Sequence, residues 1–201
     1  MFDHNTNACI FGMRGAGKST LCREIQTYYN NIFIFDTLHE YSQNDGVLLP
    51  DFFTFSNFVI QTHKDKNIRA IIQIPIEAAM FENNFDHYMK MLYYRGNCTV
   101  VIEEVQNFAS VHKIPPYLKQ ISLTGRHKQV NFITTTQRLA EIHKSLLSQS
   151  HHIFAGYTDS PNDQKTLKEY GFNIDEIHKL EKFQFLWKNE REIIKIDNSI
   201  N

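Results

Sequence analysis

Residues 12–20 combine glycine, lysine and hydroxyl side chains in a spacing that suits phosphate chemistry. They read Gly-Met-Arg-Gly-Ala-Gly-Lys-Ser-Thr and follow directly on an apolar run at 8–11. This order satisfies GxxxxGK[ST], in which the N–H groups of a glycine-rich turn and of a helix N-terminus surround phosphate oxygens. We expect Lys18, at the exposed lip of this loop, to reach the β- and γ-phosphates, and Ser19 to supply an oxygen to Mg²⁺. The predicted nucleotide-binding residues are Gly12, Arg14, Gly15, Ala16, Gly17, Lys18, Ser19 and Thr20.

Two adjacent acids, Glu103 and Glu104, follow a second apolar run at 99–102. Four β-forming residues followed by acids make a Walker B pattern, because ligands of open α/β sheets bind at the carboxyl ends of the strands. We expect Glu103 to hold Mg²⁺, directly or through water, and Glu104 to polarise the attacking water. The first acid of this pattern is usually Asp, and the longer Glu103 favours an indirect contact. A strand that simply ends in solvated acids is the alternative.

Gln137 and Arg138 follow the next expected strand, at 131–136. If this strand lies between those at 8–11 and 99–102, Gln137 lies beside the γ-phosphate, where its amide responds to the nucleotide state through hydrogen bonds. The alternative is a glutamine that only caps the next helix. Asp36 ends the run at 32–35, and it fits either the phosphate site or a cap of the next turn.

Composition excludes several classes of protein. The 201 residues have a formal net charge of −1 and are 42% hydrophobic, unlike a polybasic nucleic-acid binder or a disordered chain. No apolar run reaches the roughly 18 residues that span a bilayer, and the N-terminus lacks the pattern of a signal peptide, so we expect a cytoplasmic protein with no transmembrane segment. Cys9, Cys22 and Cys98 have no CxxC spacing, which favours buried thiols. His151 and His152 lack a third metal ligand at a recognisable spacing.

The order of elements predicts an α/β fold, in which a mostly parallel sheet is flanked by helices. Expected strands cover 8–11, 32–35, 69–74, 99–102, 130–135 and 152–155, and expected helices cover 18–29, 77–94, 117–127 and 138–148. Short helices at 164–170 and 174–180 and a hairpin at 183–196 are expected at the edge of the sheet. No repeat or linker divides the chain. We therefore expect a single domain, 1–201, with a core at about 6–157 and a C-terminal extension at about 158–201.

The motifs together resemble the FtsK–HerA superfamily of P-loop ATPases, which has a RecA-like (ASCE) fold. Its members carry a catalytic Glu after Walker B, an Arg-His-x-x-Val/Leu segment that enters the next strand, and Thr/Ser-Gln-Arg at the end of that strand. This chain has matching residues at 12–20, 102–104, 125–131 and 135–138. Its size and its order of elements over 6–197 are similar to the genome-packaging ATPases of tailless icosahedral viruses with internal membranes and double-jelly-roll capsids.

The resemblance implies a homo-oligomeric ring, a hexamer or pentamer, that translocates double-stranded DNA using Mg²⁺ and ATP. The resemblance also implies that the protein is located in the host cytoplasm and at the packaging vertex of the virion, where its partners are capsid or membrane vertex proteins. Arg126 matches the arginine that completes a neighbour's site in trans, and Arg138 is the second candidate. Lysines multiplied around a ring could line a positive pore in a near-neutral protein. The candidate DNA contacts are Lys64, Lys66, Lys113 and Lys119, although solvated loops are the alternative.

Other classes of P-loop protein are weighed against this interpretation. An assembly ATPase of filamentous phage usually carries a membrane segment. A small-molecule or nucleotide kinase needs an arginine-rich lid and an acceptor pocket, whereas the paired acids and Gln137 suit water as the acceptor. A regulatory switch would bind nucleotide without steady turnover. Hydrolysis stimulated by duplex DNA separates a motor from the last two.

Overall fold

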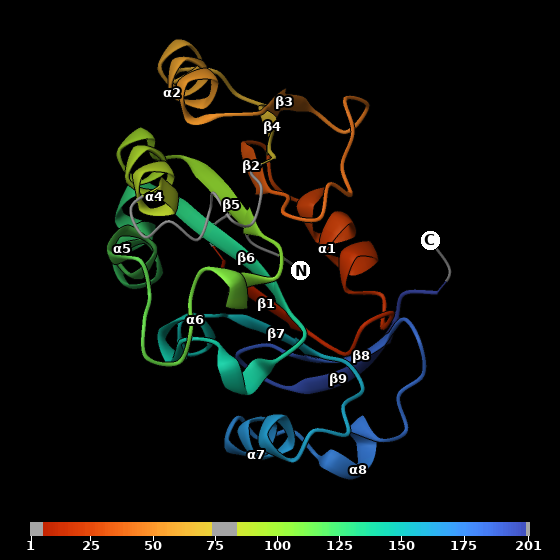
Figure 1. Ribbon diagram of the computed structural model, residues 1–201. Helices are drawn as coiled ribbons and strands as arrows, with labels where there is room; N and C mark the ends of the chain where they lie inside the picture. The colour runs from red at the N-terminus through yellow and green to blue at the C-terminus, as the bar shows by residue number, and fades with distance from the viewer. Residues whose placement is uncertain (1–5, 74–83, 200–201) are drawn as a thin grey trace.

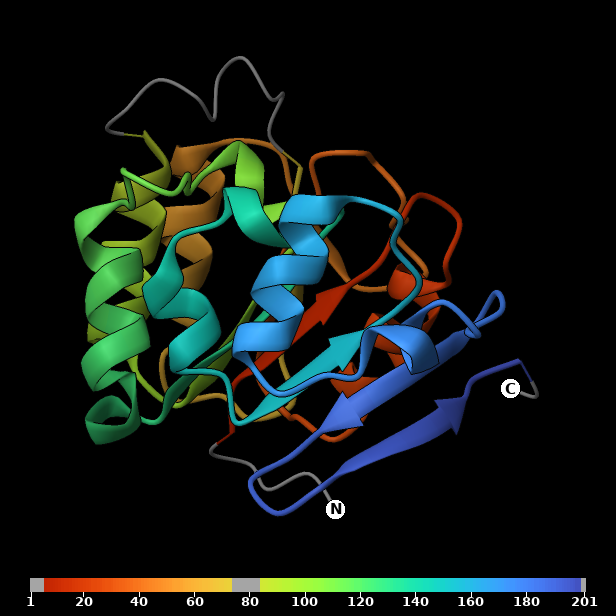
Figure 2. The same cartoon turned by 90° about the horizontal axis from the view of Figure 1, so that it is seen from below.

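The computed structural model describes residues 6–73 and 84–199 and shows a nine-stranded sheet with helices on both faces (Figure 1, Figure 2). The strands lie in the order β3-β4-β2-β5-β6-β1-β7-β8-β9. Pairing is parallel from β3 to β7, and β8 and β9 are added antiparallel. Their bounds are β1 Ala8–Phe11, β2 Ile32–Phe35, β3 Val47–Leu49, β4 Arg69–Ile72, β5 Cys98–Ile102, β6 Val130–Thr136, β7 His152–Ala155, β8 Gln184–Lys188 and β9 Ile193–Asp197.

The central strands are buried along their whole length, which explains the mostly apolar sequences of β1, β2 and β5, while β6 also buries Asn131 and three threonines. Every residue of β1, β2, β5 and β6 is buried. A parallel strand covered on both faces has no solvent side, so it reads as a continuous apolar run instead of an alternating one. This property made these strands predictable, and the expected α/β class is confirmed.

The helices divide unequally between the two faces of the sheet. Helix α1 (Lys18–Gln26) covers one face through Leu21, Cys22 and Ile25. The opposite core receives side chains of the other main helices, which Figure 1 shows on the far side of the sheet from α1. They are α2 Phe52–Gln61, α4 Asn84–Arg95, α5 Pro116–Thr124, α6 Lys144–Ser148, α7 Pro161–Glu169 and α8 Ile174–Ile177. No helix within the described residues is long and apolar enough to cross a bilayer.

Strand β3 and helix α2 are additions to the expected order of elements. The α2 sequence, FFTFSNFVIQ, has no charged residue and is rich in aromatic and β-branched side chains, which resembles a strand more than an amphipathic helix. Asp51 resolves the ambiguity, since its side chain accepts a hydrogen bond from the Thr54 N–H at 2.7 Å. That N-cap satisfies a helix-end donor and starts the helix.

Several expected helices differ in their bounds. The helix expected at 138–148 is two pieces, a 3₁₀ turn at Leu139–Glu141 and α6, because His143 accepts from the Ser145 N–H and begins a new helix. The helix expected at 117–127 ends at Thr124 and passes into a 3₁₀ turn, Gly125–Lys128. The helix expected at 18–29 ends at Gln26. Of the helix expected at 77–94, residues 77–83 lie outside the described part of the chain.

Candidate nucleotide-binding site

The glycine-rich loop joins the carboxyl end of β1 to the start of α1, as the sequence predicted. Gly15 (φ 81°) and Gly17 (φ 98°) have left-handed backbones that side chains rarely adopt. Gly17 is also the N-cap residue of α1. An added Cβ there would meet the ring of Phe183. The loop therefore needs glycine at this position both for its backbone and for close packing against the C-terminal extension.

Lys18 differs from the expectation of an exposed lip residue, because it is only 8% exposed. Its Nζ donates to the Met13 carbonyl at 3.4 Å and lies 3.9 Å from Oε1 of Glu104. Burial lowers the pKa of Lys18, while Glu104 and Glu103 oppose that shift. The ammonium therefore lies inside the site, facing the acid that would act as the base.

Glu104 and Gln137 lie in direct contact. Strand β6 lies between β5 and β1, the arrangement that the prediction for Gln137 required, and Gln137 Nε2 donates to Oε1 of Glu104 at 2.9 Å. Gln106 Nε2 donates to Oε2 of the same carboxylate at 2.5 Å. The Glu104 backbone is left-handed (φ 49°), and its N–H donates to Oγ1 of Thr135. Both carboxylate oxygens are thus oriented by amides on either side.

Glu103 has a different environment from its neighbour. It is 2% exposed, and its Oε1 accepts from the Tyr41 hydroxyl at 2.8 Å. Burial raises the pKa of Glu103 to about 7, opposed by the Tyr41 hydrogen bond and reinforced by Glu40 and Asp36. A desolvated carboxylate beside other acids suits a divalent cation, because the cation supplies the missing positive charge. Glu103, one of the two oxygen donors expected for Mg²⁺, therefore fits that ion.

Tyr41 belongs to a buried network that the sequence analysis missed. Gln26 Nε2 donates to the Tyr41 hydroxyl at 3.1 Å, and Arg69 donates to Oε1 of Gln26 at 2.6 Å. The guanidinium of Arg23 lies 4.1 Å from the Tyr41 ring centroid. Arg23 and Gln26 lie on α1, whereas Tyr41 and Arg69 come from two other segments, and no local spacing connects these three segments. Only the strand order brings them to Glu103.

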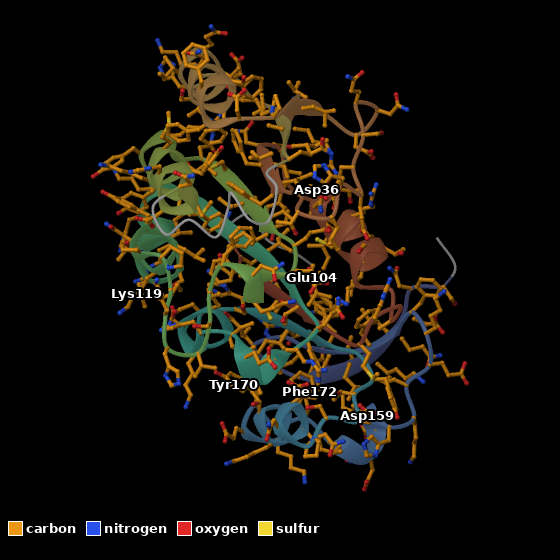
Figure 3. All side chains as sticks on the ribbon, in the orientation of Figure 1. Asp36, Glu104, Lys119, Asp159, Tyr170 and Phe172 are labelled. Atoms are coloured by element: carbon orange, nitrogen blue, oxygen red, sulfur yellow. The ribbon has the colours of Figure 1, made fainter. Side chains whose placement is uncertain are left out.

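Asp36, whose role the sequence left open, caps the turn that follows β2. Its two carboxylate oxygens accept from the backbone N–H groups of Glu40 and Tyr41, each at 3.0 Å. This cap places the Tyr41 ring over α1 and its hydroxyl toward Glu103. Figure 3 shows Asp36 and Glu104 at neighbouring parts of one edge of the sheet.

The two arginines considered for the trans role, Arg126 and Arg138, lie at opposite ends of strand β6. Arg126 is exposed in the 3₁₀ turn that precedes β6, so it lies at the opposite edge of the sheet from Gln137, which follows β6. A seven-residue strand separates these edges by roughly 20 Å. Arg126 therefore lies far from its own phosphate loop. Arg138 and Arg14 are exposed at the carboxyl ends of the strands, where the phosphate loop lies.

The four lysines proposed to contact DNA form two exposed groups that the fold does not bring together. Lys64 and Lys66 lie between α2 and β4, at the amino edge of the sheet. Lys113 lies in the loop after β5, at the carboxyl edge, and Lys119 lies on α5 (Figure 3). No single lysine patch on one subunit contains all four.

The cysteine and histidine interpretations can also be compared with the structure. All three cysteines are free and buried. His151 Nδ1 accepts from the Asn7 N–H, and His152 Nδ1 accepts from the Trp187 indole. No cluster of three or more potential metal-binding His, Cys, Asp or Glu residues occurs in the described residues. His151 thus accepts from a backbone donor at an exposed position, and the buried His152 accepts from a side chain.

Comparison with known proteins identifies the fold. No family model matches the chain. Protein P9 of Pseudoalteromonas phage PM2 is 23% identical over 176 residues, which cover 85% of this chain and 76% of Protein P9. The genome packaging NTPase B204 from Sulfolobus turreted icosahedral virus 2, solved in complex with AMPPCP, is 17% identical with a TM-score of 0.75, covering 96% of this chain and 98% of B204. VirB4 of Thermoanaerobacter pseudethanolicus is 11% identical with a TM-score of 0.62, covering 98% and 91%. The chain has the P-loop NTPase fold of B204 and VirB4.

Proposed function

We propose that the chain is an ATP-hydrolysing motor that translocates double-stranded DNA and packages a viral genome into a preformed capsid. The observation that carries the chemistry is the convergence of Lys18, Glu104 and Gln137 beside the phosphate loop. A cation for the γ-phosphate, a carboxylate base and an orienting amide suit phosphoryl transfer to water. The packaging task is supported by the fold shared with B204, described as a genome packaging NTPase, along almost the whole of both chains.

Ser19 and Glu103 would hold Mg²⁺, which neutralises phosphate charge when it is bound with ATP. The loop N–H groups bind the phosphates, and Lys18 stabilises negative charge that develops at the γ-phosphoryl oxygens. Glu104 accepts a proton from the attacking water, while Gln137 holds that carboxylate and the water in line with the phosphorus. The ion pair between Lys18 and Glu104 holds both groups beside the loop.

Arg126 acts in trans in this proposal. Its exposure and its position at the far edge of the sheet suit contact with a neighbouring subunit and not with its own phosphate loop. A homo-oligomeric ring, a hexamer or pentamer, would bring it to the next site, where a guanidinium stabilises the transferring phosphoryl group. Arg138, at the nucleotide edge, is the second candidate for this role.

The expected partners are double-stranded DNA, further copies of the chain, and capsid or membrane vertex proteins, met in the host cytoplasm and at the packaging vertex. Lys64 and Lys66, or Lys113 and Lys119, would contact the DNA backbone. Because the two pairs lie apart on the subunit, variants of each pair can be tested separately. The loss of DNA stimulation in one double Lys→Ala variant and not the other would identify the contacting pair.

Steady hydrolysis and its dependence on duplex DNA test the proposal. The wild type should hydrolyse ATP with Mg²⁺, and duplex DNA should raise the rate several-fold. Lys18→Ala should abolish turnover, and circular dichroism should show that it remains folded. A rate that is indifferent to DNA, or transfer of the phosphoryl group to a small-molecule acceptor instead of water, would contradict the motor and favour a switch or a kinase.

A further inference from the structure

The positions of the catalytic groups determine in which direction a bound nucleotide must extend. Lys18, Glu104 and Gln137 mark the γ-phosphate end, and they lie toward β5 and β6. Strand β1, which leads into the phosphate loop, is flanked by β6 on that side and by β7 and then β8 on the other. A triphosphate wrapped by the loop therefore directs its nucleoside away from β5, toward the C-terminal extension.

The extension contacts the phosphate loop on this far side. The Phe183 N–H, just before β8, donates to the Ala16 carbonyl at 2.9 Å. A Cβ built on Gly17 would lie 2.4 Å from the Phe183 ring, so that ring packs directly on the loop backbone. Figure 1 and Figure 2 show the same proximity, with the blue segment before β8 beside the red loop between β1 and α1.

Phe183 is held in an unusual conformation. Its φ is 69°, in the left-handed region that bulky residues rarely adopt. Two backbone hydrogen bonds maintain it, since its N–H donates to Ala16 and its carbonyl accepts from the Asn198 N–H at 2.9 Å. A non-glycine residue kept in this region costs free energy that the surroundings must offset, and such residues cluster at ligand sites.

Phe183 also has the chemistry of a base-contacting residue. It is half-buried, so part of the side chain stays accessible beside the loop. The Nζ of Lys182 lies 4.8 Å from the ring centroid, so a cation accompanies the ring. An aromatic face accepts any nucleobase by stacking.

We infer that Phe183, supported by Lys182, forms the nucleoside end of the site, with its ring against the base of the bound nucleoside triphosphate. The C-terminal hairpin would then be part of the nucleotide site and not only an edge of the sheet. This inference rests on the proposed ATP-binding function, and it assigns a ligand contact to a residue outside every motif that the sequence analysis identified.

The test compares a ligand that has a nucleoside with one that lacks it. Isothermal titration calorimetry with Mg²⁺ would measure the Kd of AMPPCP and of inorganic tripolyphosphate for the wild type, Phe183→Tyr and Phe183→Asn. Asparagine removes the ring but tolerates the left-handed backbone. Phe183→Asn therefore tests the ring while the backbone contact with the phosphate loop is kept. We expect Phe183→Asn to weaken AMPPCP about tenfold or more and to leave tripolyphosphate within about twofold. Phe183→Tyr should bind both as the wild type does.

Equal weakening of both ligands in Phe183→Asn would overturn the inference in favour of a bracing role, and unchanged AMPPCP binding would overturn it outright. A wild type that binds neither ligand would instead contradict the ATP site itself. If Phe183→Asn does not fold, Phe183→Trp provides a second readout, in which tryptophan fluorescence beyond the wild-type response should change with AMPPCP and not with tripolyphosphate. The same change with both ligands would contradict base contact.

Discussion

The Lys18 ammonium lies 3.9 Å from Oε1 of Glu104, and both side chains are buried. The cation that should bind the γ-phosphate is therefore paired with the proposed catalytic base. A triphosphate competes for this cation with more negative charge than one carboxylate carries. Its arrival would draw Lys18 away and release Glu104, still held by Gln106 and Gln137, to act on water.

Glu104→Gln should retain ATP binding and lose hydrolysis by about 10³-fold, because an amide preserves the shape but cannot accept the proton. It also removes a competitor for Lys18, so ATP should bind at least as tightly as in the wild type. Calorimetry and steady-state phosphate release measure the two properties. Glu103→Gln is the comparison, and it should weaken Mg²⁺-dependent binding. Loss of binding in Glu104→Gln with loss of hydrolysis alone in Glu103→Gln would reverse the two roles.

Tyr41→Phe should raise the Mg²⁺ concentration needed for half-maximal hydrolysis by about tenfold, a typical effect of removing a hydrogen bond to a metal ligand. The hydroxyl donates to Glu103 at 2.8 Å, and its loss leaves that carboxylate less well oriented. The rate at saturating Mg²⁺ should fall less. Tyr94→Phe, on the exposed surface of α4, is the matched control. An unchanged Mg²⁺ requirement in Tyr41→Phe would remove Tyr41 from the site.

His152 should make the protein less stable in acid. Burial lowers its pKa to about 4, with His151 reinforcing the shift and Glu190 opposing it. Between that pKa and the ordinary value of 6.5, the unfolded chain binds the proton that the folded chain excludes, so stability falls as the pH decreases through this window. Replacing the side chain with leucine should remove on the order of 2 kcal/mol of this loss.

Urea unfolding at about pH 7 and about pH 4.5 measures that difference. The readout is the change in unfolding free energy between the two pH values, compared between wild type and His152→Leu, because carboxyl groups add an acid dependence common to both. His127→Leu, at an exposed position, should show the same change in unfolding free energy between the two pH values as the wild type. If His152→Leu shows the same change as the wild type, His152 is not the titrating group.

Arg126→Ala protein should bind ATP and hydrolyse it about 10³-fold more slowly, if its guanidinium reaches a neighbour's γ-phosphate. Mixing it with Lys18→Ala protein should restore activity, because a Lys18→Ala subunit presents an intact arginine to the intact loop of an Arg126→Ala subunit. Light scattering would verify mixed oligomers. No recovery in such oligomers would exclude the trans role, and recovery with Arg138→Ala instead would assign it to Arg138.

How much the sequence could predict depends on how locally each feature is encoded. The phosphate loop is contiguous, and the pairing of Glu104 with Gln137 follows from parallel strands ending at one edge. The contact of Tyr41 with Glu103 joins positions 62 residues apart with no periodic signal. The packing of Phe183 on Gly17 likewise depends on an antiparallel hairpin added after the core. The sequence analysis placed Lys18 at an exposed lip because lysine is charged, yet its ion pair with Glu104 permits burial.

Displacement of a third strand from duplex DNA tests the central claim most directly. A triplex-forming oligonucleotide bound to a linear duplex is expelled by a protein that moves along that duplex, and is left in place by one that only binds. With ATP and Mg²⁺ the wild type should release the labelled oligonucleotide, whereas Glu104→Gln with ATP, or the wild type with AMPPCP, should not. Steady ATP hydrolysis by oligomers bound to the duplex, with no oligonucleotide released, would contradict the account of this chain as a DNA translocase.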